Sequence, residues 1–151
     1  MKYGWKPKTS IRLDAQTVGE HLDNLHERLG QRLTPADILK DAKRKRSPIH
    51  GAFEWDDAQA AVVHRLTQAS YMLRSITVIV EECPDLGPVR AFVHVEREDS
   101  FYTNIRHAMS EPDLRQYTIG QAMRELAEFQ KKYAGIKELA GVFAEIKKVA
   151  A

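Results

Sequence analysis

The chain has 151 residues, of which 43% are hydrophobic and 29% charged, a composition typical of one globular domain that excludes an intrinsically disordered chain. Its single cysteine, Cys83, excludes an internal disulfide. The sequence has neither a run of 18 apolar residues nor an apolar signal segment near its N-terminus. We therefore expect a cytoplasmic protein with no membrane partner.

The net charge of +2 conceals an uneven distribution. Residues 1–50 carry 11 Lys and Arg against 6 Asp and Glu, whereas residues 51–100 carry 4 against 9. Positive charge gathered in one third of a chain is a pattern that can indicate contact with nucleic acid, although a solvated basic face has the same pattern.

Two amphipathic helices are predicted near the N-terminus. The first begins after Asp14, ends before Gly30, and has apolar residues at spacings of three and four, namely Ala15, Val18, Leu22, Leu25 and Leu29. The second begins with Thr34 as N-cap, Pro35 in the first turn and Asp37 three residues after the cap. This second helix is expected to extend to about Arg46.

A third helix is predicted after Pro48 and Gly51, starting at residues 56–57. Its apolar face would comprise Ala58, Val62, Leu66, Ala69, Leu73 and Ile76. The β-branched segment 75–82, the turn residues 83–88 and the alternating segment 89–97 then predict an antiparallel β-hairpin. Residues 101–109 are expected to form a strand end and a short helix.

Two helices are predicted to complete the chain. The longer one starts from a capping pattern with Ser110, Pro112 and Asp113, and ends at Gly135. Its apolar residues are Ile119, Ala122, Met123, Leu126, Phe129 and Tyr133, and those of the last helix are Ile136, Leu139, Val142, Phe143 and Ile146. The last set could pack on the chain's own core or form an oligomer interface.

The predicted fold is α+β, with an N-terminal three-helix unit, a central antiparallel β-hairpin and two C-terminal helices. We expect a single domain over residues 1–151, with subdomains 1–75 and 76–151, because neither repeats nor long linkers interrupt the chain.

Residues 47–57, SPIHGAFEWDD, raise the question of an acidic site. Adjacent carboxylates at a helix start, such as Asp56 and Asp57, point about 100° apart and do not converge on a cation. As N-cap and first-turn residue they would instead favour the helix dipole, and Phe53 and Trp55 would be buried anchors beside them. Arg65 could pair with Asp57 or another carboxylate. We interpret the stretch as a helix boundary.

The run KRKR at residues 43–46 is the most distinctive feature of the sequence. One or two cations suffice to complement the C-terminal end of a helix dipole, so the others would repel one another unless phosphates relieve the repulsion. The N-terminal residues would add a basic arm. The predicted nucleic-acid contacts are Lys6, Lys8, Lys40, Lys43, Arg44, Lys45 and Arg46. A helix-turn-helix would place such charge at the start of the second helix, so we favour backbone contact.

Other chemistry is not indicated by the sequence. The six histidines match no metal-site spacing, glycine-rich phosphate loops are missing, and nucleophile and base pairs can be drawn only arbitrarily. We expect no catalytic, metal or cofactor site and a protein that is not an enzyme.

The segments TPADILKDAKRKRSPIHGAFEWDDAQAA, RAFVHV, FYTNIRHAMSEPDLRQ and QAMRELAEFQKKYAGIKELAGVFAEI resemble those of a group of small proteins encoded by tailed bacteriophages and prophages. The resemblance spans nearly the whole chain, and its most specific part is SPIHxxFEWDD after the TPxD helix start. It implies that the gene lies near phage replication or recombination genes and that the protein acts in the cytoplasm of a bacterial host cell. It implies no activity and no catalytic residue. The KRKR run departs from the more acidic turn of the group.

Two hypotheses follow. The first is a non-enzymatic accessory protein of phage origin that binds double-stranded DNA through its basic N-terminal face. The alternative is an interaction protein without nucleic-acid contact, which forms a homo-oligomer or binds a phage or host protein. In it the long helix and the terminal helix form the interface, and the apolar residues within 136–146 are its main feature.

Overall fold

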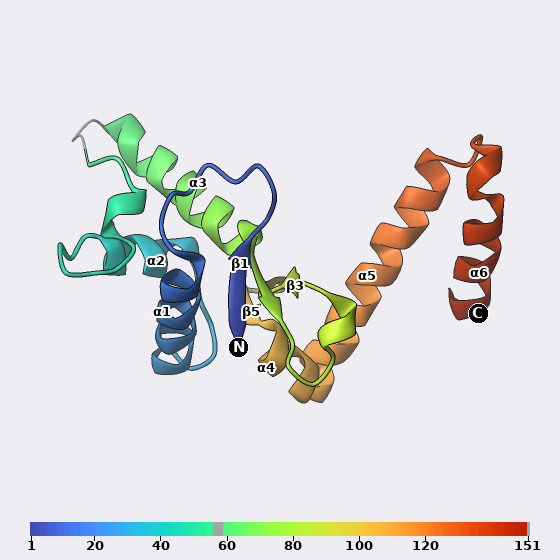
Figure 1. Cartoon of the computed structure of the whole chain (residues 1–151), viewed down its shortest axis with the longest axis horizontal. Coiled ribbons are helices and arrows are strands. Elements are labelled where there is room, and N and C mark those ends of the chain that lie inside the picture. The colour runs from blue at the N-terminus through green and yellow to red at the C-terminus, as the bar shows by residue number, and fades with distance from the viewer. Residues whose placement is uncertain (56–58, 151) are drawn as a thin grey trace. The chain divides into compact units, whose positions relative to one another are not determined.

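The computed structural model describes residues 1–55 and 59–150, which form two compact units, Met1–Ala108 and Met109–Ala151 (Figure 1). The predicted α+β class is confirmed, since helices accompany antiparallel sheets. The first unit contains β1 (Lys2–Trp5), α1 (Ala15–Arg28), α2 (Pro35–Ala42), η1 (His50–Ala52), α3 (Gln59–Ser75), β2 (Ile76–Ile79), η2 (Pro84–Leu86), β3 (Val89–Arg90), β4 (Phe92–Glu96) and β5 (Ser100–Asn104). α4 (Ile105–Ser110) crosses the boundary, and the second unit contains α5 (Pro112–Lys132), η3 (Lys137–Leu139) and α6 (Ala140–Ala150).

The caps of α1 and α2 are those that the sequence predicts. Asp14 accepts a hydrogen bond of 2.8 Å from the backbone N–H of Thr17. Gly30 follows the helix with a φ of +72°, which a residue without Cβ adopts easily. Thr34 and Asp37 form the reciprocal capping box of α2. Leu29, predicted on the apolar face of α1, is instead exposed at its C-cap.

The strands form two sheets rather than the one hairpin that we expected. β1, β2 and β3 make an antiparallel sheet in the order β1-β2-β3, with Tyr3 opposite Val78 and Val78 opposite Val89. The chain leaves this sheet at Ala91, and β4 pairs with β5 in a second, tight hairpin. The alternating segment 89–97 therefore contributes to both sheets, and the alternation alone does not show where the pairing changes.

The N-terminal residues do not form the separate arm that the sequence suggested, because β1 pairs along its full length with β2. α1 packs on this strand at Gly19, where a Cβ would overlap the ring of Tyr3. The close approach of helix and strand therefore requires a glycine at this position.

The core of the first unit contains side chains from its helices and from both sheets. Its largest fully buried side chains include Phe92, Leu22, Ile38, Met72 and Leu73. Two predictions for the third helix are wrong: Val62 is 46% exposed, and Ile76 begins β2, which follows α3 without a loop. Because α3 continues directly into a strand, the predicted apolar residues in its C-terminal half, Ala69 and Leu73, are buried. The predicted apolar residue Val62, in its N-terminal half, is exposed instead. Residues 75 and 76 thus both lie inside the first unit.

The second unit is a pair of helices joined by a turn. Glu111 occupies the N-cap position of α5 that was predicted for Ser110. α6 begins at Ala140 because the preceding 3₁₀ turn contains Leu139, so the predicted last helix starts four residues late. Phe143 packs against Phe129 with ring centroids 6.2 Å apart, and it is the one buried side chain among residues 109–149.

Candidate nucleic-acid interface

The basic run forms a compact turn after α2, not the last turn of a longer helix. α2 ends at Ala42, and the chain then folds back through hydrogen bonds from Arg44 N–H to Asp41 O (3.1 Å) and from Ser47 N–H to Arg44 O (2.8 Å). The expected extension to Arg46 is therefore wrong. The physical reason is the side chain of Asp41, which draws both Arg44 and Ser47 towards itself.

Asp41 is the centre of a buried polar cluster, and its side chain is only 3% exposed. Its Oδ2 lies 2.6 Å from His21 Nε2 and accepts a 2.6 Å hydrogen bond from Ser47 Oγ. Its Oδ1 is ion-paired with Arg44 and lies 3.9 Å from Arg28. A buried carboxylate is tolerated when charged and hydrogen-bonding partners surround it, so this cluster fixes the turn against α1 and α2.

The electrostatics of the cluster favour a neutral His21. Burial of the ring is the main cause that lowers the pKa of His21, and the nearby charges of Arg28 and Arg44 lower it further. The positive charge beside Asp41 is therefore supplied by Arg28 and Arg44.

Asp41, His21 and Ser47 do not have the geometry of a catalytic triad. In a triad the carboxylate and the nucleophile contact opposite nitrogens of the imidazole. Here His21 Nε2 faces both Asp41 and Ser47, and its distance to Ser47 Oγ is 3.5 Å. The serine donates to the carboxylate instead. The arrangement holds a loop in place and has no proton relay.

The outer surface of the turn is cationic. Lys43, Lys45 and Arg46 are exposed and have no ion-pair partner within residues 1–55 and 59–150, and Lys40 is exposed on the preceding helix. Arg44 remains 61% exposed although it pairs with Asp41. An open hollow lies on each side of Arg44, one lined by Arg28 and Lys40 among others, the second by His21 and residues 44–48.

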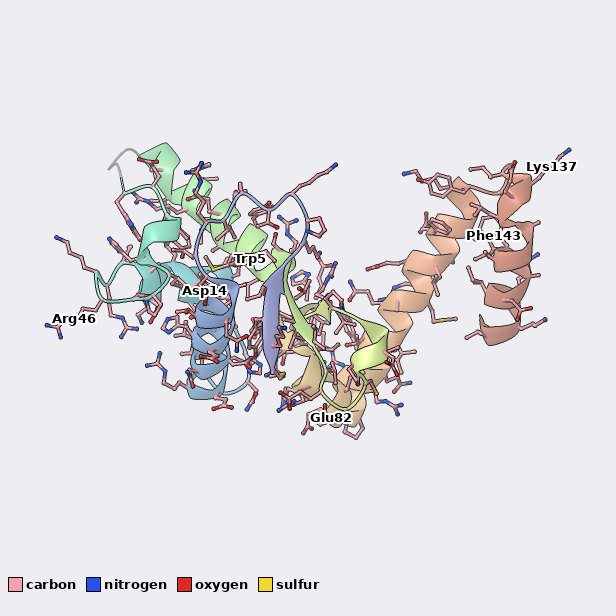
Figure 2. The ribbon with its side chains drawn as sticks, viewed as in Figure 1. Trp5, Asp14, Arg46, Glu82, Lys137 and Phe143 are labelled. Carbon is pink, nitrogen blue, oxygen red and sulfur yellow. The ribbon has the colours of Figure 1, made fainter. Side chains whose placement is uncertain are left out.

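The structure does not bring Lys6 and Lys8 to this surface. Figure 2 shows Trp5, at the end of β1, well separated from Arg46. The backbone N–H of Lys6 donates a 3.0 Å hydrogen bond to Ser75 O, which fixes this residue beside the end of α3. Burial lowers the pKa of Lys6, and the charges of Arg90 and Arg74 lower it further, so these three cations form a separate basic group.

Residues 48–55, which follow the turn, have structural contacts, as expected for a helix boundary. Phe53 is buried, as predicted, and Trp55 stacks on His50 with ring centroids 4.9 Å apart. Arg65 is buried, donates to the backbone oxygen of Glu54, and places its guanidinium over Trp55. The predicted cap residues Asp56 and Asp57, and Ala58, lie outside the described residues.

Sequence reasoning missed the residues that organise the turn, namely His21, Arg28, Asp41 and Ser47. A signal was present for one of them. Asp41 lies three residues after Ile38 and one before Ala42, both of which are fully buried, so a carboxylate stands on the apolar face of α2. A charge in that position requires a buried partner, and the cations that follow could supply it.

Comparisons with known proteins identify no relative. No protein-family model matches the chain, and neither a curated protein nor a solved structure shows significant similarity to it. In the part of the chain that the structure describes, none of the helices is long and apolar enough to cross a membrane, and no three His, Cys, Asp or Glu side chains gather to hold a metal ion.

Proposed function

We propose that the protein is a non-enzymatic accessory protein that binds double-stranded DNA through the turn at residues 43–46. The observation that carries the proposal is the arrangement around Asp41. The carboxylate is buried and engaged, whereas Lys43, Lys45 and Arg46 are exposed and unpaired among the described residues. A rigid turn with cations on its outer side suits phosphate contacts, because little side-chain and loop ordering remains to be done on binding.

The contact that we propose is with the DNA backbone rather than with base edges. The cations follow the C-terminal end of α2, while its N-terminal end carries the Thr34–Asp37 capping box. A recognition helix reads bases mainly with its N-terminal residues, so α2 is not suited to that role. The binding should therefore depend little on DNA sequence and strongly on salt.

We assign Lys40 and Arg44 supporting roles in the proposed contact with DNA phosphates. Lys40 is exposed beside the hollow that Arg28 and Arg44 also line, so all three can lie near the same phosphates. Lys6 and Lys8 would contact DNA at a second place, together with Arg74 and Arg90, rather than as a flexible arm. The resemblance to phage and prophage proteins supports a role in the cytoplasm of a bacterial host.

The test compares two triple variants of the full chain. Lys43→Ala, Lys45→Ala and Arg46→Ala remove the exposed cations and leave the Arg44–Asp41 ion pair in place. The control, Lys131→Ala, Lys137→Ala and Lys147→Ala, removes the same charge from the second unit. Binding to an arbitrary duplex is followed by fluorescence anisotropy at about 50 mM salt, where backbone contacts are strong.

The first triple variant should bind at least about tenfold more weakly than wild type, and the control should remain within about threefold of it. Equal losses in both variants would show that net charge alone acts, and unchanged affinity of the first variant would remove the turn from the interface. Far-UV circular dichroism verifies that both variants are folded.

A further inference from the structure

The second unit presents a long apolar seam that its own helices leave uncovered. Along α5 the apolar residues follow a spacing of three, four, three and four, which is the a and d pattern of a coiled coil: Ile119, Ala122, Leu126, Phe129 and Tyr133. Ile119 is 47% exposed, Leu126 37% and Phe129 41%. Apolar residues in such a pattern are normally covered by a facing helix.

α6 does not supply that cover. Its described contact with the seam is the packing of Phe143 on Phe129, near the turn that joins the two helices. Figure 1 shows α5 and α6 diverging from this turn, and Ile119, Ala122 and Leu126, which lie earlier in α5 than Phe129, are exposed. Two helices that bury one side chain among residues 109–149 do not reach the burial that an independent fold needs.

Among residues 1–55 and 59–108, the first unit exposes no matching apolar face. Its exposed large apolar side chains, among the residues described, are Leu29, Val62, Val63 and Leu86. They belong to the end of α1, the beginning of α3 and η2, and therefore do not form one strip. Scattered apolar side chains of this kind are ordinary on a protein surface.

The charges beside the seam select the partner. Glu125 and Lys132 both lie at g positions, on the same edge of the seam. When two copies of α5 run antiparallel so that Leu126 of one meets Phe129 of the other, each Glu125 faces the Lys132 of the second copy. The two-fold symmetry then forms this pair twice. The opposite edge carries Met123 and Gln130, which are uncharged.

We propose that α5 is a dimerisation helix that binds α5 of a second copy of this chain in antiparallel orientation. The seam supplies the apolar contact, and the paired Glu125 and Lys132 fix the orientation. Net charge does not oppose the association, because residues 109–151 carry 7 Lys and Arg against 6 Asp and Glu. Of the residues first expected at an oligomer interface, Phe143 lies inside the helical pair, while Ile136 and Val142 are exposed beside it.

Light scattering and sedimentation of the full chain test this proposal without any DNA. Wild type should reach twice the chain mass of 17.2 kDa as its concentration rises. Leu126→Gln, in the middle of the seam, should shift the protein to the monomer. A wild type that stays monomeric at all concentrations would overturn the proposal.

Charge reversal tests the orientation. Glu125→Lys and Lys132→Glu each create two repulsive pairs, and each should raise the dimer dissociation constant roughly tenfold or more. The double variant should restore it to within about threefold of wild type, since opposite charges again face each other. Glu128→Lys, a reversal on the same helix outside the seam, is the matched control and should change little. A dimer that is insensitive to Glu125→Lys, or a double variant that does not recover, would contradict the antiparallel pairing.

Discussion

At the scale of residues, the basic turn depends on one buried carboxylate. Asp41 accepts from Ser47, contacts His21 and pairs with Arg44, and its side chain is almost inaccessible to solvent. Buried charges remain in folded proteins when their partners satisfy them, and they become costly when the network is broken. The position of the exposed cations is thus set by a side chain that is itself almost completely buried.

Asp41→Asn keeps the shape of the side chain but removes its charge. We expect the free energy of unfolding to fall by about 2 kcal/mol, because hydrogen bonds to a charged group are lost in a buried site. The same change at Asp99, which is 80% exposed and lies 3.5 Å from Arg32, should cost less than about 0.5 kcal/mol. Urea denaturation of the three proteins measures both effects. Equal stability of Asp41→Asn and wild type would show that the cluster does not hold the turn.

We expect His26 to make the stability of the first unit depend on pH. It is fully buried, and its Nε2 lies 2.9 Å from Thr103 Oγ1 and accepts from the backbone N–H of Asn104 at 3.3 Å. Burial lowers the pKa of His26 below its ordinary value of about 6.5, and the charge of His107 lowers it further, although Asp23 and the backbone at Gln31 act in the opposite direction.

In the folded state His26 binds fewer protons than in the unfolded state. Its contribution to the free energy of unfolding is therefore fully present above about pH 6.5 and is lost as the pH falls through the lowered pKa. His21, whose pKa is also lowered, acts with the same sign. We expect wild type to lose up to about 1.4 kcal/mol per pH unit for each histidine in this window. Urea unfolding at pH 7.5, 6.5 and 5.5 should show a smaller loss for His26→Gln. Parallel curves for the variant and wild type would exclude His26 as a cause.

At the scale of elements, the sequence correctly predicted the helices and caps that short-range interactions form. The caps at Asp14 and Thr34, the short helix after residue 104 and the long helix that begins near Pro112 agree with the sequence. β1 was missed because its partner β2 lies more than 70 residues away, and four residues carry no periodic signal. The early end of α2 was missed because a tertiary cluster, not a helix breaker, ends it.

Two helical glycines, Gly19 in α1 and Gly120 in α5, allow the effect of tight packing to be distinguished from that of helix propensity. Gly19→Ala should lower the free energy of unfolding by about 1–3 kcal/mol, since the new methyl group overlaps the ring of Tyr3 on β1. Gly120→Ala in α5 should raise it by about 0.5–1 kcal/mol, because its nearest neighbour would be the mobile end of Arg124 at 3.6 Å. Thermal denaturation measures both. Stabilisation by Gly19→Ala would show that α1 does not need the close approach to β1.

At the scale of the whole molecule, the first unit has one basic and one acidic cluster in different places. Four consecutive exposed cations lie on the turn at residues 43–46, and the exposed carboxylates Glu81, Glu82 and Asp85 belong to the loop around η2. Figure 2 shows Arg46 and Glu82 at different edges of this unit. Such a separation orients a protein towards a polyanion before contact, so the basic turn would meet DNA first.

The salt dependence of duplex DNA binding tests the central claim most directly. The logarithm of the association constant is plotted against the logarithm of salt concentration for wild type and for the variant with Lys43→Ala, Lys45→Ala and Arg46→Ala. If the three side chains contact phosphates, the wild-type slope should be steeper by about 2 to 3, as expected from counterion release at three sites. Identical slopes, or no binding of wild type at low salt, would contradict the assignment of the turn as a DNA contact.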